Sequence, residues 1–234
     1  MPSHQYTRIK ICGITSVADA RLAAEAGADY IGVIIEIDFS PRRLSVEQAR
    51  PICEQSTLPV VTLFFNREAE QIRKAVDILR PHAIQLLGQE PPSLISALKN
   101  TVNCQLWKSI HLPPLASGAI DIAVYEETIK AMVDAGIDAI IIDTFVGSAP
   151  DARRYGGTGV VSDWEVARRL VETSPVPTFL AGGINPQNVR QAIEQVHPYG
   201  IDLCSGVESA PGQKDPEKLR QLISAIHGIV PVKR

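Results

Sequence analysis

The sequence lacks several features that would point to particular protein classes. It contains no uninterrupted apolar run of about 18 residues, the length that a membrane-spanning helix needs, so no membrane association is expected. Its net charge is -3, so it lacks the concentrated positive charge that binding to nucleic acid requires. Its N-terminal residues 1–7 are polar and contain no apolar core of a secretory signal. We therefore expect a cytoplasmic protein with a small-molecule ligand.

Cysteine is also scarce and scattered. The four cysteines form no CxxC pair, and the five histidines show no spacing that would complete a zinc site with them. A chain of 234 residues can bury a sizeable core without a disulfide framework. The pattern predicts reduced thiols and no metal.

What the sequence does contain is a regular alternation of strand-length apolar runs and helix-length amphipathic segments. The expected strands are 8–12, 30–35, 60–65, 82–87, 105–110, 139–143, 177–181 and 201–205. The expected helices are 17–26, 45–55, 67–79, 92–99, 123–135, 162–173, 186–196 and 216–227. Continuous apolar runs are typical of parallel strands covered by helices on both faces. A doubly wound open sheet is one solution, but eight regular repeats favour a single (β/α)8 barrel domain over residues 1–234.

Two residues at the ends of expected strands are candidates for catalysis. Cys12 ends the first strand, just before Gly13, and could serve as a base or nucleophile if its pKa is lowered. Its alternative role is that of a small buried apolar residue. Asp143 follows three consecutive isoleucines and could act as a general acid in an apolar pocket, or simply as a cap. Both would lie at the catalytic face of a barrel, on opposing sides of it.

Two further polar residues are candidates for binding. Arg42, in the loop after the second strand, could hold a carboxylate through two hydrogen bonds, although such a residue is usually solvated. Asp202 lies within the eighth strand, where an inward side chain could contact a ligand. The alternative for Asp202 is a satisfied residue near the start of a strand.

Glycine-rich loops follow the sixth, seventh and eighth expected strands. Glycine allows backbone amides to approach an anion closely, and barrels often bind phosphate with the loops after strands seven and eight. Clusters on three consecutive loops therefore predict a phosphorylated ligand. The candidate phosphate-binding residues are Gly157, Gly159, Gly182, Gly183, Ser205 and Gly206.

These motifs occur together in one known family. They are KICGIT (10–15), AGAD (26–29), SPR (40–42), DT (143–144), YGGTG (155–159), DW (163–164), AGGINP (181–186), SGVES (205–209) and PG (211–212). Over about residues 8–227 the chain resembles the phosphoribosylanthranilate isomerases of tryptophan biosynthesis. The resemblance implies a (β/α)8 barrel without metal or cofactor.

It also implies an aldose–ketose isomerase that carries out an Amadori rearrangement. The substrate would be the small phosphorylated sugar amine N-(5-phosphoribosyl)anthranilate, and the product 1-(2-carboxyphenylamino)-1-deoxyribulose 5-phosphate. By the same resemblance, Cys12 is the general base, Asp143 the general acid, and Arg42 the residue that holds the anthranilate carboxylate. The sequence is compatible with either a monomer or a homodimer.

The chain departs from the family pattern at several positions. Glu36 and Asp38 add acids near the expected substrate entrance, Leu87 replaces a histidine, Val160 a lysine, and Cys204 the first serine of the last motif. The loop 145–155 is longer than usual, and its closure as a lid is left open. Two alternatives therefore remain: a related barrel isomerase for another phosphosugar, and a non-catalytic phosphometabolite-binding paralogue.

Overall fold

The computed structural model describes residues 6–113, 120–146, 154–155 and 163–227. Within these residues a ring of parallel strands closes on itself, because β1 pairs with both β2 and β10. The strands of the ring are β1 (Arg8–Ile11), β2 (Tyr30–Ile35), β4 (Val60–Phe64), β5 (Ala83–Leu86), β6 (Gln105–Leu112), β7 (Ala139–Val146), β9 (Thr178–Leu180) and β10 (Gly200–Leu203). The closure confirms the (β/α)8 barrel and excludes the open doubly wound sheet.

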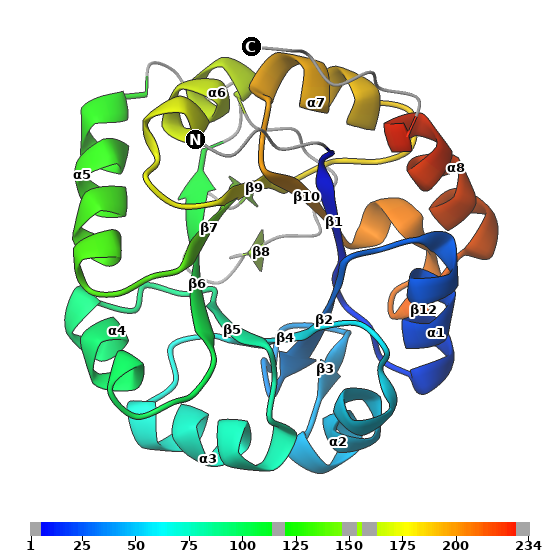
Figure 1. The fold of residues 1–234 in the computed structure, drawn as a ribbon, viewed down its shortest axis with the longest axis horizontal. Coiled ribbons are helices and arrows are strands. Elements are labelled where there is room, and N and C mark those ends of the chain that lie inside the picture. The colour runs from blue at the N-terminus through cyan, green and yellow to red at the C-terminus, as the bar shows by residue number, and fades with distance from the viewer. Residues whose placement is uncertain (1–5, 114–119, 147–153, 156–162, 228–234) are drawn as a thin grey trace.

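Helices surround this ring, as Figure 1 shows in a view along the barrel. They are α1 (Val17–Ala26), α2 (Val46–Gln55), α3 (Ala69–Leu79), α4 (Pro92–Lys99), α5 (Ile122–Asp134), α6 (Trp164–Thr173), α7 (Val189–Val196) and α8 (Pro216–His227). Local sequence sets several of their ends. Ser45 and Gln48 form the capping box at the start of α2, and Gly27 ends α1 in the left-handed conformation.

Short elements that were not predicted extend from the ring. They are β3 (Arg43–Leu44), β8 (Arg154–Tyr155), the 3-10 turn η2 (Ser205–Val207), β11 (Glu208–Ala210) and β12 (Gln213–Lys214). β11 and β12 pair as an antiparallel hairpin after the last barrel strand. β8 pairs with the end of β7, so the two described ends of the loop 145–155 lie together. The rest of that loop is outside the described residues.

The predicted helix 186–196 begins later than expected, at Val189. The cause is a local turn in which Asn185 and Asn188 hydrogen-bond backbone groups in place of a helical turn. The Asn188 side chain accepts from the amide of Asn185, and the Asn185 side chain accepts from the amide of Gln187. Such asparagine turns compete with helix formation. They leave the glycines after β9 in an irregular loop at the catalytic face.

The apolar core has two layers. The outer layer lies between the ring and the helices and includes Ile11, Ile142 and Leu203. The inner layer fills the lumen, and at the amino-terminal end of the strands it is aromatic. There the rings of Trp107 and Phe179 stack with centroids 5.0 Å apart. This packing closes one end of the lumen, so chemistry is confined to the other.

Candidate active site

Cys12 and Asp143 both face the lumen. Side chains alternate between the two faces of a strand: Ile11 lies in the outer layer and Cys12 in the inner one. On β7, Ile142 is in the outer layer and Ile141 in the inner one, so Asp143 faces the lumen as well. The sheet order places β9 and β10 between the two strands. The residues therefore face one space from strands three positions apart, not from directly opposed strands.

Neither residue is the last of its strand. β1 ends at Ile11, although the amide of Cys12 still donates to the Leu203 carbonyl at 2.7 Å and so continues the ladder. β7 runs past Asp143 to Val146. Both side chains belong to nearly buried residues, 7% exposed for Cys12 and 8% for Asp143. Both groups are therefore largely removed from water, where protonation equilibria are easily shifted.

The in-register neighbour of Asp143 on β6 is His111, to which no sequence pattern pointed. Its Nε2 lies 2.7 Å from the carbonyl oxygen of Leu87, so this nitrogen carries a proton. Burial lowers the pKa of His111 to about 4, which keeps the ring neutral near pH 7. Leu87 stands where the family pattern has a histidine. The structure thus brings an imidazole to the same rim from the next strand of the ring.

A buried ion pair lies one lumen position below Cys12. Lys10 has no exposed surface, and its Nζ lies 2.8 Å from Oδ2 of Asp202, its register partner on β10. Burial disfavours the ammonium, but the attraction of Asp202, Cys12 and Cys204 together outweighs this and raises the pKa of Lys10. A side chain at Gly32 on β2 would come within 2.8 Å of the Cys12 sulfur and 3.1 Å of the Lys10 nitrogen. Glycine at this position therefore makes room for both groups.

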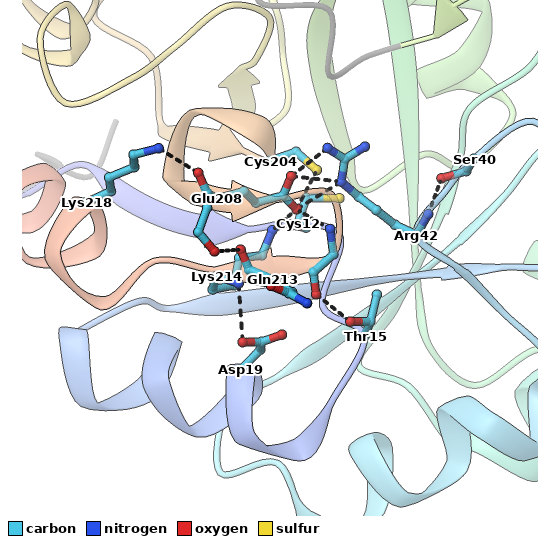
Figure 2. Close-up of polar contacts among 12 residues, drawn as sticks. Cys12, Thr15, Asp19, Ser40, Arg42, Cys204, Glu208, Gln213, Lys214 and Lys218 are labelled. Carbon is cyan, nitrogen blue, oxygen red and sulfur yellow. Dashed lines mark hydrogen bonds and ion pairs between the residues drawn. The ribbon is translucent and has the colours of Figure 1, made fainter.

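Arg42 is held in place by the hairpin after β10, as Figure 2 shows. Its Nε donates to Oε1 of Glu208 at 2.9 Å, and its Nη2 to Oε2 at 2.5 Å. Glu208 also accepts from Lys214, whose Nζ lies 2.8 Å from Oε1 and 2.6 Å from the carbonyl oxygen of Cys12. Burial alone would raise the pKa of Glu208, but these two cations outweigh it and lower the pKa. The sequence predicted Arg42 but not this network.

Gly13 meets two separate requirements of this site. Its φ is +71°, in the left-handed region that favours glycine. A Cβ there would also lie 2.6 Å from Cδ of Arg42 and 2.7 Å from Sγ of Cys204. The glycine after Cys12 thus lets the arginine and the second thiol pack against the backbone.

The side chains of Cys12 and Cys204 lie beside each other in Figure 2, and the Cys204 thiol also lies 4.0 Å from Oε1 of Glu208, to which it donates. A hydrogen bond with Cys204 lowers the pKa of Cys12; burial opposes the effect, and the positive charges of Lys10 and Lys214 support it. The same bond and burial raise the pKa of Cys204 well above its ordinary value. Cys12 is therefore the thiol that ionises first.

The loops after β9 and β10 form one irregular surface. Gly182 and Gly183 have φ values of +83° and +67°. A side chain at Gly206 would meet the carbonyl oxygen of Ile184 at 2.2 Å, so the two loops pack directly together. Among the described residues, no backbone bond outside the helices and strands involves the amides of Gly182 or Gly183, and Ser205 and Gly206 are the first residues of η2, where amides have no partner within the turn. Adjacent free amides of this kind suit an anion. Gly157, Gly159 and Val160 lie outside the described residues.

Glu36 is an acid that the family pattern lacks, and a nearby arginine partly compensates its negative charge. The Arg67 guanidinium donates to the Glu36 carbonyl oxygen at 2.6 Å and lies 3.6 Å from its carboxylate. Glu36, Asp38 and Arg43 line a surface hollow of about 500 Å³ beside α2. Neither Cys12 nor Asp143 lines this hollow. The acids therefore lie outside the lumen, with a cation beside one of them.

Two other findings concern the described residues only. In these ranges no three histidine, cysteine, aspartate or glutamate side chains gather as a metal site would require. No helix there combines the length and the apolar character needed to cross a membrane.

A (β/α)8 barrel with a thiol and a carboxyl group facing its lumen, and with free amides on the loops after β9 and β10, defines the class of barrel enzymes that act on phosphorylated small molecules. Comparisons with known proteins narrow this class. The model of the N-(5'-phosphoribosyl)anthranilate (PRA) isomerase family matches residues 9–225. The chain belongs to this family.

Similar relatives span almost the whole chain. The N-(5'-phosphoribosyl)anthranilate isomerase of Methanocella arvoryzae is 37% identical over 226 residues, which cover 94% of this chain and 98% of the relative. That of Geobacter metallireducens is 37% identical over 220 residues, covering 92% and 96%. The crystal structure of the Thermotoga maritima phosphoribosyl anthranilate isomerase is 29% identical, with a TM-score of 0.79 and coverage of 95% and 100%. A complex of phosphoribosyl anthranilate isomerase with reduced 1-(o-carboxyphenylamino)-1-deoxyribulose 5-phosphate has a TM-score of 0.76, at 29% identity and the same coverage.

Proposed function

We propose that the chain isomerises N-(5'-phosphoribosyl)anthranilate to 1-(2-carboxyphenylamino)-1-deoxyribulose 5-phosphate, with Cys12 as general base and Asp143 as general acid. Family membership supports the reaction. One structural observation supports the two roles: both side chains face the lumen near the carboxyl ends of their strands, on either side of β9 and β10. A substrate bound between them meets an acid and a base on different sides.

The reaction needs one proton delivered and one removed on neighbouring atoms. The Asp143 carboxyl group protonates the ribose ring oxygen while its bond to C1 breaks, and the anilino nitrogen supplies the electron pair of the new C1–N double bond. The Cys12 thiolate then removes the proton from C2, and those electrons form an enolamine. Protonation at C1 and loss of the C2 hydroxyl proton give the ketone. Each placed proton transfer contributes about 10²–10⁴ in rate.

The surroundings of Cys12 suit a base. Its hydrogen bond with Cys204 favours the thiolate, as do the ammonium groups of Lys10 and Lys214. Lys214 also holds the Cys12 carbonyl oxygen at 2.6 Å, which fixes the backbone that carries the thiol. The base is thus charged and held in place by the same two lysines and the neighbouring thiol.

Arg42 is proposed to hold the anthranilate carboxylate. Glu208 engages Nε and Nη2 and so fixes the plane of the guanidinium. This leaves the Nη1 side for the ligand, and Glu208 acts as a positioning residue. Because Arg42 also packs against Gly13, the carboxylate it holds would be close to the thiol.

The phosphate is proposed to sit on the free amides of Gly182, Gly183, Ser205 and Gly206, and its remote binding energy holds the sugar for reaction. Gly157 and Gly159 stay predicted members of this site. Asp202 is a second proposed contact. Its Oδ1 is buried and has no hydrogen-bond partner among the described residues, so it can accept from a ribose hydroxyl.

The test is turnover of N-(5'-phosphoribosyl)anthranilate generated in the assay, followed by the loss of its anthranilate fluorescence. Cys12→Ser and Asp143→Asn should each lower kcat by about 10²–10⁴-fold, because each removes one proton transfer. The matched controls are Cys53→Ser on α2 and Asp134→Asn at the exposed end of α5, which should leave kcat unchanged. Near-normal turnover in either test variant would remove that residue from the mechanism.

An inactive but folded wild-type protein would favour the other readings of the sequence. Activity on a different phosphosugar would support the related isomerase, and ligand binding without turnover would support the binding paralogue.

The proposal also includes a cytoplasmic location, which suits four free cysteines. Monomer and homodimer are separable by sedimentation. One of the similar solved structures is described as monomers of a dimeric phosphoribosylanthranilate isomerase from Thermotoga maritima.

A further inference from the structure

We propose that Cys12 and Cys204 form a reversible redox pair: a hydroperoxide oxidises Cys12, and Cys204 then closes a disulfide that removes the base from the lumen. The chemical partner is hydrogen peroxide or a small organic hydroperoxide, and a dithiol reverses the reaction. The inference goes beyond the isomerase activity, and only its effect on turnover rests on the proposed function.

The backbone already places the two cysteines as a disulfide requires. The register of β1 and β10 pairs Ile11 with Leu203, and the ladder continues through the 2.7 Å bond from the Cys12 amide to the Leu203 carbonyl. Cys12 and Cys204 are the next pair along these strands. Neighbouring strands lie about 4.7–4.9 Å apart, within the Cα separations of about 4.4–6.8 Å that disulfides span.

The side chains also point the same way. Alternation puts Cys12 in the lumen layer, and Cys204 packs against that layer. Figure 2 shows the two side chains next to each other beside the Arg42–Glu208 pair, and a Cβ at Gly13 would lie 2.7 Å from the Cys204 sulfur. Closing the bridge therefore calls for side-chain rotation on two adjacent strands, without a change in their pairing.

The two thiols are suited to different steps. A thiolate, not a thiol, attacks a peroxide, and Cys12 is the one whose pKa is lowered, by its bond with Cys204 and by Lys10. Cys204 stays protonated because of that bond, burial and the charge of Cys12. Oxidation of Cys12 removes that charge, and Lys214 and Arg42 then favour the Cys204 thiolate.

The atoms and electrons balance with peroxide as the oxidant. The Cys12 sulfur attacks one peroxide oxygen, an S–O bond forms, the O–O bond breaks, and the released hydroxide takes up a proton to give water. Cys204 loses its proton and attacks the Cys12 sulfenic acid; an S–S bond forms and a second water leaves. Two thiols and one hydrogen peroxide thus give one disulfide and two waters.

The remaining cysteines provide internal controls. Burial raises the pKa of Cys53 and of Cys104 to about 11 each, so both react slowly with peroxide. The matched variant is Cys204→Ser, because serine is the residue of the family pattern at this position. It keeps a hydroxyl beside Cys12 and removes the resolving sulfur, and its oxidised and reduced samples are each compared with its own turnover before oxidation.

The experiment treats the full-length wild type and Cys204→Ser with excess hydrogen peroxide, then with dithiothreitol. Non-reducing peptide mass mapping of the wild type should show a Cys12–Cys204 linked peptide that has lost two hydrogens. Its turnover should fall by about 10²–10⁴-fold and return after reduction, because the bridged Cys12 cannot take a proton. In Cys204→Ser, Cys12 should proceed to the sulfinic acid, and dithiothreitol should not restore turnover.

The absence of the linked peptide in treated wild type, or equal recovery of the two proteins, would overturn the redox pair. The mass measurement needs no substrate, so it stands even if the protein acts on a different phosphosugar. A linked peptide with unchanged turnover would instead overturn Cys12 as the base and leave the redox pair in place.

Discussion

Replacing Lys10 with methionine removes the ammonium from the floor of the proposed site while keeping a side chain of similar length. Lys10 and Asp202 are joined at 2.8 Å, and both are almost wholly buried. Removing one partner of a buried pair costs about 3–5 kcal/mol, because the other charge is left uncompensated. We expect this loss in Lys10→Met at pH 8. In Lys10→Met/Asp202→Leu the loss should be far smaller, because no buried charge remains.

The loss should also depend on pH, with a defined sign. Without Lys10, burial raises the pKa of Asp202 further above its ordinary 3.8. A group whose folded pKa is raised is stabilising below its unfolded pKa and loses that contribution as pH rises through the folded value. The difference in the free energy of unfolding between Lys10→Met and wild type should therefore be smaller at pH 5 than at pH 8.

Urea unfolding at both pH values measures these quantities, with the four proteins of the double-mutant cycle compared at equal slope. A second readout is the pH profile of kcat/KM. Loss of the Lys10 charge should shift its acid limb to higher pH, because Lys10 favours the Cys12 thiolate. Losses that simply add in the double variant would refute the coupling of the pair. An unmoved acid limb would show that Lys10 does not act on the thiol.

Two further variants test the residues that hold Arg42 in place. Gly13→Ala should lower the free energy of unfolding, measured by heat or urea, more than Gly27→Ala does. Both glycines have a positive φ, so the backbone strain is similar. The added Cβ at position 13 would lie 2.6 Å from Arg42, whereas the one at position 27 would find its nearest neighbour, Ile223, at 3.8 Å. Equal costs would show that close packing at Gly13 is unimportant. The pKa of Glu208 is lowered, so its contribution is present above the ordinary 4.5 and is lost as pH falls through the folded value. In Glu208→Gln, stability should fall less steeply at acid pH than it does in the wild type. The variant should also raise KM more than it lowers kcat, because it releases Arg42. An unchanged dependence of stability on acid pH would mean that the network adds no stability.

The fold could be predicted because the signals that specify it are local. Apolar runs of strand length, the capping box at Ser45 and the glycine at the end of α1 are each legible within a few residues. The alternation of strands and helices then leaves few topologies, of which the closed barrel fits the length. Strand ends were less accurate, because β7 continues beyond Asp143 through pairing with distant residues of β6.

The polar network was not predictable in the same way. The Arg42–Glu208 contact joins residues 166 positions apart, and the Lys10–Asp202 contact joins residues 192 apart. A lysine within an apolar run usually indicates a position near the end of a strand. Nothing close to Lys10 in the sequence identifies Asp202 as its partner. His111 was missed for the same reason: its link to the rim runs through the backbone of Leu87, just after the neighbouring strand β5.

Register explains why these groups meet. In a parallel barrel, a lumen-facing residue on one strand lies beside a lumen-facing residue on the next strand. The register therefore decides which polar side chains of adjacent strands can interact. Lys10 pairs with Asp202, and one lumen position further along, Cys12 neighbours Cys204. A one-residue slip of β10 would turn Asp202 and Cys204 toward the helices. It would leave Lys10 without its counter-charge and Cys12 without its hydrogen-bond partner. The charge state of the thiol is therefore set by the same backbone pairing that closes the barrel.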